Sequence, residues 1–399
     1  MSVARGRQFL HTPGPTNMPE RVLRAMDRAA MDHRGPEFTA LALACYEGLR
    51  WVFRTEGAVL VFPSAGHGAW EAAFVNTCSP GDRVLMAETG AFAQWWKELA
   101  EGFGLRVDYL AGDWRHGADP AALEAALRDD RAREIRAVAI VHNETSTGIV
   151  SRLAEIRRAI DAADHPALLI VDTISSLASM DFRMDEWRVD VAVGGSQKGL
   201  MLPPGSSFNA VSAKALAASQ SARLPRAYWD WRPMLPKGRD MDFTCTPAVN
   251  LFFGLKEALA MLGEEGLDAV FERHRRLAEA VRRAVAAWGA DGGIELQSLH
   301  PAEHSNSVSA IRLPEGHDAE AVRGIARERF DTVLGAGLLR LRGRAFRIGH
   351  LGDLNAPMIL GALAAAEMAL RANGVPHRPG GVQAALDCLA EPPAKGTAP

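Results

Sequence analysis

A glycine-containing turn, a carboxylate and a lysine each follow an apolar run of this sequence. The turn is PSAGHGAWE at 63–71, the carboxylate is Asp172 in LLIVDTISS, and the amine is Lys198 in GGSQKG. In open α/β sheets, ligands bind beside the carboxyl ends of the parallel strands. If the apolar runs are strands of one sheet, the three features lie at the same edge of it.

These features have complementary chemistry. A glycine-containing turn that opens a helix binds anions through unpaired N–H groups, so a phosphate is expected at 64–68. A lysine amine forms an imine with an aldehyde, and a carboxylate pairs with a protonated ring nitrogen. Together they are the parts needed to hold pyridoxal phosphate. Imine formation requires a neutral amine, whereas a free lysine has a pKa of about 10.4. We therefore expect the site to lower the pKa of Lys198 by desolvation or by a neighbouring cation.

Each feature alone also allows other interpretations. The turn could be purely structural, Asp172 could cap a turn, and Lys198 could lie in a solvated loop. The run beginning at Gly66 nearly spells a dinucleotide fingerprint, with Glu88 twenty residues after Gly68, so an NAD-dependent oxidoreductase is an alternative. Against it, Glu71 stands where the third glycine of that fingerprint allows close helix–strand packing.

Composition restricts the class of protein. The 399 residues are 48% hydrophobic and 23% charged, which are ordinary globular values, and the length predicts two lobes. With 45 basic and 48 acidic residues the net charge is −3, which offers no electrostatic argument for binding nucleic acid or an anionic membrane. We expect small-molecule partners.

The cysteines and the termini suggest a compartment. The four cysteines show neither a C-x-x-C pair nor a nearby histidine group, so no disulfide scaffold and no metal site are expected. The apolar runs are about five residues long, far below the roughly twenty that span a bilayer. The first fifteen residues lack the apolar core of a signal peptide. We expect a cytoplasmic protein.

Alternating strands and helices must position the site. Several runs are apolar throughout, which is typical of strands covered on both faces, and the segments between them have helical spacing. This predicts an α/β fold, with a mainly parallel sheet covered by helices on both faces. The expected strands are 58–62, 83–87, 106–110, 137–141, 167–171, 189–193 and 207–211, and the expected helices are 68–78, 91–102, 119–129 and 151–163.

The pattern changes after about residue 248. Long helical stretches and the short runs 308–313 and 345–351 predict a smaller α+β domain, followed by a tail rich in helix breakers. The expected divisions are an N-terminal segment near the active site (1–20), a large cofactor-binding domain (21–250), a small C-terminal domain (251–375) and a loosely ordered tail (376–399).

Several motifs together resemble a known family. HNETSTG at 142–148, LLIVDTISS at 168–176 and GSQKG at 195–199 are the most specific pieces, and the match runs from TPGPTNMPERV at 12–22 to FRIGHLG at 346–352. The chain resembles the fold-type I, class V aminotransferases of the alanine/serine/aspartate–glyoxylate group.

The resemblance implies a role for individual residues. Lys198 would carry the cofactor imine, Asp172 would face the ring nitrogen, and Arg347 would grip the substrate carboxylate, although RLRGRAFR at 340–347 could also be a solvated surface. Thr246 would reach the phosphate of the neighbouring subunit, which implies a homodimer with shared sites. The further cofactor contacts that the resemblance implies are Ala65, Gly66, His67, Phe92, Thr145 and Gln197.

Two positions depart from the family pattern. Ala65 stands where relatives usually have Ser or Thr, and Phe243 where some have Tyr. Two hydroxyl contacts to the phosphate are therefore missing. At about 0.5–1.5 kcal/mol for each ordinary hydrogen bond, their loss would weaken cofactor retention without abolishing it.

We predict a pyridoxal phosphate-dependent transaminase that moves an amino group from a small amino acid to glyoxylate by a ping-pong mechanism. The motif DHRGPEF, with His33 and Arg34, favours serine as the donor, while aspartate, alanine and ureidoglycine stay open. A pyridoxal phosphate lyase or desulfurase is a further alternative, for which Cys245 is the cysteine nearest a site segment. A non-enzymatic binding role would give Lys198 and Asp172 no joint purpose.

Overall fold

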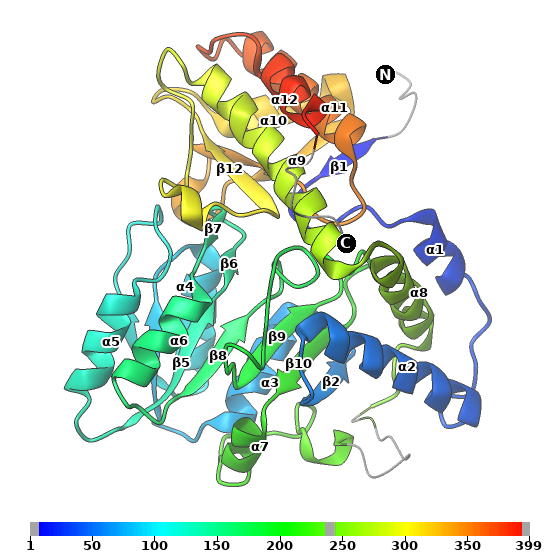
Figure 1. Ribbon diagram of the computed structural model, residues 1–399, viewed down its shortest axis with the longest axis vertical. Coiled ribbons are helices and arrows are strands. Elements are labelled where there is room, and N and C mark those ends of the chain that lie inside the picture. The colour runs from blue at the N-terminus through cyan, green and yellow to red at the C-terminus, as the bar shows by residue number, and fades with distance from the viewer. Residues whose placement is uncertain (1–7, 236–242, 244, 393–399) are drawn as a thin grey trace.

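The computed structural model describes residues 8–235, 243 and 245–392. Within these ranges the large sheet has seven strands in the order β2-β10-β9-β8-β5-β3-β4, and β10 alone runs antiparallel to its neighbours (Figure 1). The strands are β2 (Ala58–Phe62), β3 (Arg83–Ala87), β4 (Arg106–Leu110), β5 (Ile135–Val141), β8 (Leu168–Asp172), β9 (Val191–Gly195) and β10 (Ser207–Val211). The predicted α/β class with a mainly parallel sheet is confirmed.

Both faces of this sheet are buried. Successive residues of β2 point to opposite sides, since Val59 and Val61 enter one apolar core and Leu60 and Phe62 enter the other. The first core is completed by α2 (Pro36–Phe53), α5 (Pro120–Asp129), α6 (Leu153–Ala162) and α8 (Val249–Glu265). The second is completed by α3 (Gly66–Thr77), α4 (Ala91–Gly102) and α7 (Ala213–Ser219). Burial on both faces explains why these strands are apolar throughout instead of alternating.

A smaller sheet has the order β1-β13-β14-β12-β11. Its strands are β1 (Phe9–His11), β11 (Glu295–Leu296), β12 (Val308–Arg312), β13 (Thr332–Ala336) and β14 (Ala345–Gly349), and helices α9 (Leu267–Trp288), α10 (Ala319–Phe330), α11 (Ala356–Ala372) and α12 (Gly381–Ala390) pack with it. Helix α9 begins in the first core of the large sheet and ends in the core of the small one, so it joins the two lobes (Figure 1). We propose that the domain boundary lies near residue 250, as the sequence suggested.

The remaining elements are short connectors. They are α1 (Glu20–Met26), the hairpin β6 (Asn143–Glu144) and β7 (Ile149–Val150), and the 3₁₀ turns η1 (Arg232–Met234), η2 (Pro301–Glu303) and η3 (Leu339–Leu341). Among the described residues, every helix is too short or too polar to span a bilayer.

The C-terminal region differs from the sequence-based expectation. Part of the expected loosely ordered tail, 376–399, forms α12, whose Ala385 and Cys388 are buried in the small-lobe core. The helix breakers lie on either side of it: Pro376 and Pro379 precede its first residue and Pro392 follows its last. Residues 393–399 lie outside the described residues.

Candidate active site

The carboxyl ends of β2, β8 and β9 meet at one edge of the large sheet. Strands β8 and β9 are parallel neighbours, with Asp172 opposite Val193, and β2 runs in the same direction because both β2 and β9 are antiparallel to β10. Asp172 is the last residue of β8, and Lys198 follows β9 by three residues. The fold therefore brings the turn, the carboxylate and the amine to one edge, as their positions after apolar runs predict.

The Lys198 amine is buried. Lys198 is only 7% exposed, and its Nζ donates a hydrogen bond to the carbonyl oxygen of Pro13 at 2.5 Å. Burial lowers the pKa of Lys198 to about 7; the Arg347 guanidinium lowers it further, and Asp172 opposes both. Because the neutral amine is the nucleophilic form, this site holds Lys198 ready to react near neutral pH.

Asp172 is buried beside it and held at both oxygens. The backbone N–H of Ile174 donates to Oδ1 at 2.7 Å, and the Trp70 indole N–H donates to Oδ2 at 3.0 Å. Burial raises the pKa of Asp172 to about 7, Glu144 adds to the rise, and the two hydrogen bonds and Lys198 lower it. A cation placed next to Asp172 would therefore favour its ionised form.

The anion-binding turn is the start of α3. Ala65 is its N-cap and Gly66 and His67 are its first residues; in the part of the chain that the structure describes, no side chain caps this helix and no acidic residue lies in its first turn. A Cβ at Gly66 would collide with Ile174, so glycine allows the turn to approach the segment after Asp172. Free N–H groups and the positive end of the helix dipole can receive a phosphate.

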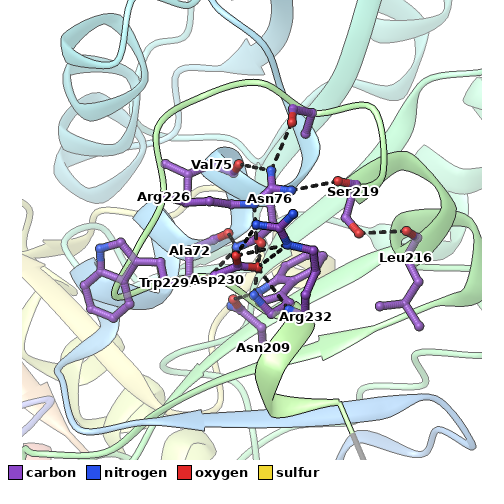
Figure 2. A network of polar contacts seen from close by, with 12 residues as sticks. Ala72, Val75, Asn76, Asn209, Leu216, Ser219, Arg226, Trp229, Asp230 and Arg232 are labelled. Carbon is purple, nitrogen blue, oxygen red and sulfur yellow. Dashed lines mark hydrogen bonds and ion pairs between the residues drawn. The ribbon is translucent and has the colours of Figure 1, made fainter. Parts of the chain in front are cut away.

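Residues 226–232 are hydrogen-bonded to α3 (Figure 2). Asn76 donates to the carbonyl oxygen of Trp229 at 2.7 Å, Arg226 donates to that of Val75 at 3.0 Å, and Asp230 pairs with Arg232. The Trp229 indole also donates to Glu71 Oε2 at 2.9 Å. The bonds to Asn76, Val75 and Glu71 fix α3, and with it the turn, to the segment that follows α7, and the Asp230–Arg232 pair lies within that segment.

Phe92 and Thr145 lie next to a buried carboxylate that sequence reasoning missed. Glu144 is fully buried; its Oε1 accepts from Ser146 Oγ at 2.6 Å and from the Phe92 N–H at 3.2 Å, and its Oε2 accepts from the Ala93 N–H at 3.0 Å. It thus caps α4 and fixes the backbone that carries Phe92. Thr145 donates to Ser175 Oγ at 2.7 Å, in the loop after Asp172.

Arg347 comes from the small lobe. It lies on β14, is only 7% exposed, and donates from Nε to the Ala336 carbonyl at 2.7 Å and from Nη1 to the Thr145 carbonyl at 2.8 Å. Burial lowers its pKa to about 10, which leaves the guanidinium charged at neutral pH. The two bonds leave further N–H donors for a carboxylate. Arg347 is therefore not part of a solvated surface, unlike Arg342 and Arg344 in the same run, which are exposed.

The N-terminal segment closes over the lysine. Thr16 donates from its backbone N–H to the Gln197 carbonyl at 3.2 Å and from its hydroxyl to the Lys198 carbonyl at 3.2 Å. Gly14 has φ +117°, and a Cβ there would collide with the Lys198 side chain, so both its conformation and its closeness to the amine favour glycine. Pro13, Gly14 and Thr16 thus all lie against Lys198 or its backbone.

Gln197 has a buried side-chain oxygen next to Lys198, whereas Thr246 is exposed. Gln197 adjoins Lys198, and its buried Oε1 lacks a hydrogen-bond partner among the described residues. Thr246 is exposed, next to Cys245, whose thiol contacts the Tyr228 hydroxyl at 3.5 Å. Its assignment to the site of a neighbouring subunit stays a proposal. Phe243 is half-buried and packs against Phe38 and Phe252, with ring centroids 5.7 and 5.9 Å away.

The acidic residue that suggested NAD has another role. Glu88 Oε1 accepts from the Trp114 indole at 3.0 Å and pairs with Arg340 of the small lobe at 2.5 Å, while Oε2 accepts from the Gly112 N–H at 3.2 Å. These contacts occupy the carboxylate that a dinucleotide ribose would need.

Comparisons with known proteins identify the family of the chain. Residues 8–336 match the family described as Aminotransferase class-V. The chain is 47% identical to a serine–glyoxylate aminotransferase of Methylorubrum extorquens, covering 97% of each chain, and 46% identical to an L-aspartate–glyoxylate aminotransferase of Paracoccus denitrificans, covering 94% of each. The solved structure of a ureidoglycine–glyoxylate aminotransferase from Bacillus subtilis superimposes with a TM-score of 0.88 at 28% identity, covering 98% of this chain and 100% of that one.

The Lys198 amine should become reactive around neutral pH. Burial lowers the pKa of Lys198 to about 7, so the neutral fraction of its amine rises as the pH passes through about 7. An ordinary lysine becomes neutral only as the pH passes through about 10.4. In protein first dialysed against hydroxylamine, which releases carbonyl compounds bound to amines, acylation of Lys198 followed by peptide mass spectrometry should increase with a midpoint near pH 7. Other lysine peptides in the same digest serve as the reference. A midpoint for Lys198 that coincides with theirs would contradict the assignment.

Proposed function

Because the chain belongs to the class V aminotransferases, we propose that it uses pyridoxal phosphate to move the amino group of a small amino acid, preferentially serine, to glyoxylate. The observation that carries the proposal is the burial of the Lys198 amine and the Asp172 carboxylate at one sheet edge, beside the uncapped start of α3. This combination matches the aldehyde, the ring nitrogen and the phosphate of that cofactor.

The residues present fit the cofactor. The start of α3 at Ala65, Gly66 and His67 offers backbone donors to the phosphate, which compensates in part for the missing hydroxyl at Ala65. The side-chain amide of Gln197 has a buried oxygen without a partner among the described residues, so this amide keeps hydrogen-bonding capacity for a bound polar group. Phe92 and Thr145 would lie against the ring, with their backbone fixed through Glu144.

When bound, pyridoxal phosphate supplies an aldehyde that condenses with amines and a protonated ring that accepts an electron pair. Asp172, held at both oxygens, would keep the proton on the ring nitrogen. Lys198 Nζ, neutral above about pH 7, can accept the proton that leaves Cα of the amino donor. Arg347 would hold the donor carboxylate with two parallel hydrogen bonds and so fix which Cα bond breaks.

Serine is the proposed donor because of the motif DHRGPEF and because the relative at 47% identity is a serine–glyoxylate aminotransferase. His33 is half-buried and Arg34 exposed before α2, with the Arg34 N–H bonded to Asp32 at 2.9 Å. Aspartate would bring a second carboxylate, which requires a cation in addition to Arg347, whereas serine requires one partner for its hydroxyl. We further propose a cytoplasmic homodimer, in which the exposed Thr246 reaches the phosphate of the partner subunit.

A donor panel tests the substrate. With glyoxylate as acceptor, serine should give a larger kcat/KM than aspartate, alanine or ureidoglycine, by about 10-fold or more, the effect of one well-placed polar contact. The panel should then be repeated with pyruvate and 2-oxoglutarate. A higher kcat/KM with aspartate would overturn the choice of donor while leaving the transaminase assignment intact.

Replacing Lys198 tests the mechanism. Lys198→Ala should remove the visible absorption band of the lysine-linked cofactor and lower kcat by about 10³-fold or more, because both the covalent attachment and the base are lost. Lys214→Ala is the matched control, since Lys214 lies on α7 and donates to the Ala167 carbonyl at 2.8 Å. Undiminished transamination by the Lys198→Ala protein is incompatible with the proposal.

Arg347 tests carboxylate recognition. Arg347→Lys keeps the charge but loses the paired donors, so KM for both the amino acid and glyoxylate should rise by about 10-fold or more, equivalent to one charged hydrogen bond. Arg344→Lys, an exposed change in the same arginine-rich run, should leave both values unchanged. Equal effects of the two substitutions would show that Arg347 does not bind the substrate.

A further inference from the structure

One indole contacts three of the proposed cofactor-binding residues. Trp70 lies in α3, is fully buried, and donates from Nε1 to Asp172 Oδ2 at 3.0 Å. Its ring centroid lies 4.5 Å from that of His67 in the anion-binding turn and 6.4 Å from that of Phe92 on α4. A single side chain thus joins the expected positions of the phosphate, the ring face and the ring nitrogen.

The bond from Trp70 restricts Asp172 in a way that burial alone does not. The Ile174 N–H holds Oδ1, and without a donor at Oδ2 the carboxylate could turn about that single contact. A donor aimed at a buried carboxylate also favours the charged over the protonated form, against the effect of desolvation. The indole is itself held in place, because it stacks on Trp96 with a centroid distance of 5.6 Å and an interplanar angle of 17°.

We propose that Trp70 is a positioning residue, whose indole N–H fixes the orientation and the ionised form of Asp172 and links both to the anion-binding turn. The inference rests on the proposed function, since it concerns how Asp172 would meet the ring nitrogen. Trp70 acts through Asp172 and is not itself placed on substrate.

The neighbouring Trp96 provides a matched control. It is equally buried in the same stack, but its Nε1 lacks a hydrogen-bond partner among the described residues. Tryptophan to phenylalanine removes the same atoms at both positions, yet only at position 70 does it remove a hydrogen bond. The comparison separates the N–H from the packing of the ring.

Trp70→Phe in the holoenzyme should lower kcat and speed release of pyridoxal phosphate, each about 10-fold, as expected for one hydrogen bond to a charged group, with the KM of the donor within about twofold. The acid limb of kcat should move to higher pH, because losing the donor raises the pKa of Asp172. Trp96→Phe keeps an aromatic ring in the stack and removes no hydrogen bond, so both rates should stay within about twofold and the pH profile should not move. Equal effects of the two variants would overturn the proposal.

A double-mutant cycle with Asp172→Asn tests whether the effect of Trp70 depends on the charge of Asp172. If Trp70 acts through the Asp172 charge, adding Trp70→Phe to Asp172→Asn should change the cofactor release rate by less than about twofold. An undiminished effect in that background would overturn the proposal. If Trp70→Phe does not fold, replacing Trp70 by benzothienylalanine keeps the bicyclic shape and removes only the N–H. The same release rates and pH profile then decide between the outcomes.

Measurements on the wild-type holoenzyme distinguish a failure of this inference from a failure of the proposed function. A wild-type protein that does not bind pyridoxal phosphate or transfer amino groups would refute the function itself. A wild-type protein that does both, together with a Trp70→Phe variant that behaves like Trp96→Phe, would refute only the role of Trp70.

Discussion

Desolvation of Lys198 and Asp172 is the constraint on which the rest of the site depends. Burial disfavours the charged form of each, and it brings both pKa values to about 7. Such groups are costly to bury unless they are hydrogen-bonded. The surrounding chain supplies those bonds: the Pro13 carbonyl accepts from the amine, and Ile174 and Trp70 donate to the carboxylate. Reactivity and structural support therefore come from the same contacts.

The site is assembled from segments that are far apart in the chain. The N-terminal segment covers Lys198, the hairpin after β5 supplies Glu144 and Thr145, and the small lobe supplies Arg347, whose guanidinium binds the Thr145 carbonyl. Because Arg347 touches the large lobe through this bond, its position depends on how the two lobes meet, and so would that of the carboxylate that we propose it binds. Phe92 depends in turn on the cap that Glu144 provides to α4.

Much of this arrangement could be predicted from the sequence, because strand ends are local signals. The runs 58–62, 83–87, 106–110 and 207–211 are strands with the predicted bounds. The turn and Lys198 follow their strands as expected, and Asp172 is the last residue of its strand. The three-residue β1 was missed, since it is defined by pairing with β13, more than 300 residues away. The supports from Trp70, Glu144 and Pro13 were missed for the same reason. Each is a contact between segments that no local pattern reveals.

The central claim is that the Lys198 amine holds the cofactor aldehyde beside Asp172. The most direct measurement is borohydride reduction of the purified holoenzyme, followed by digestion and mass spectrometry of the peptides. The account predicts a pyridoxyl phosphate group fixed to the nitrogen of Lys198. A group fixed to another lysine, or no modified peptide from protein that transfers amino groups, would contradict it.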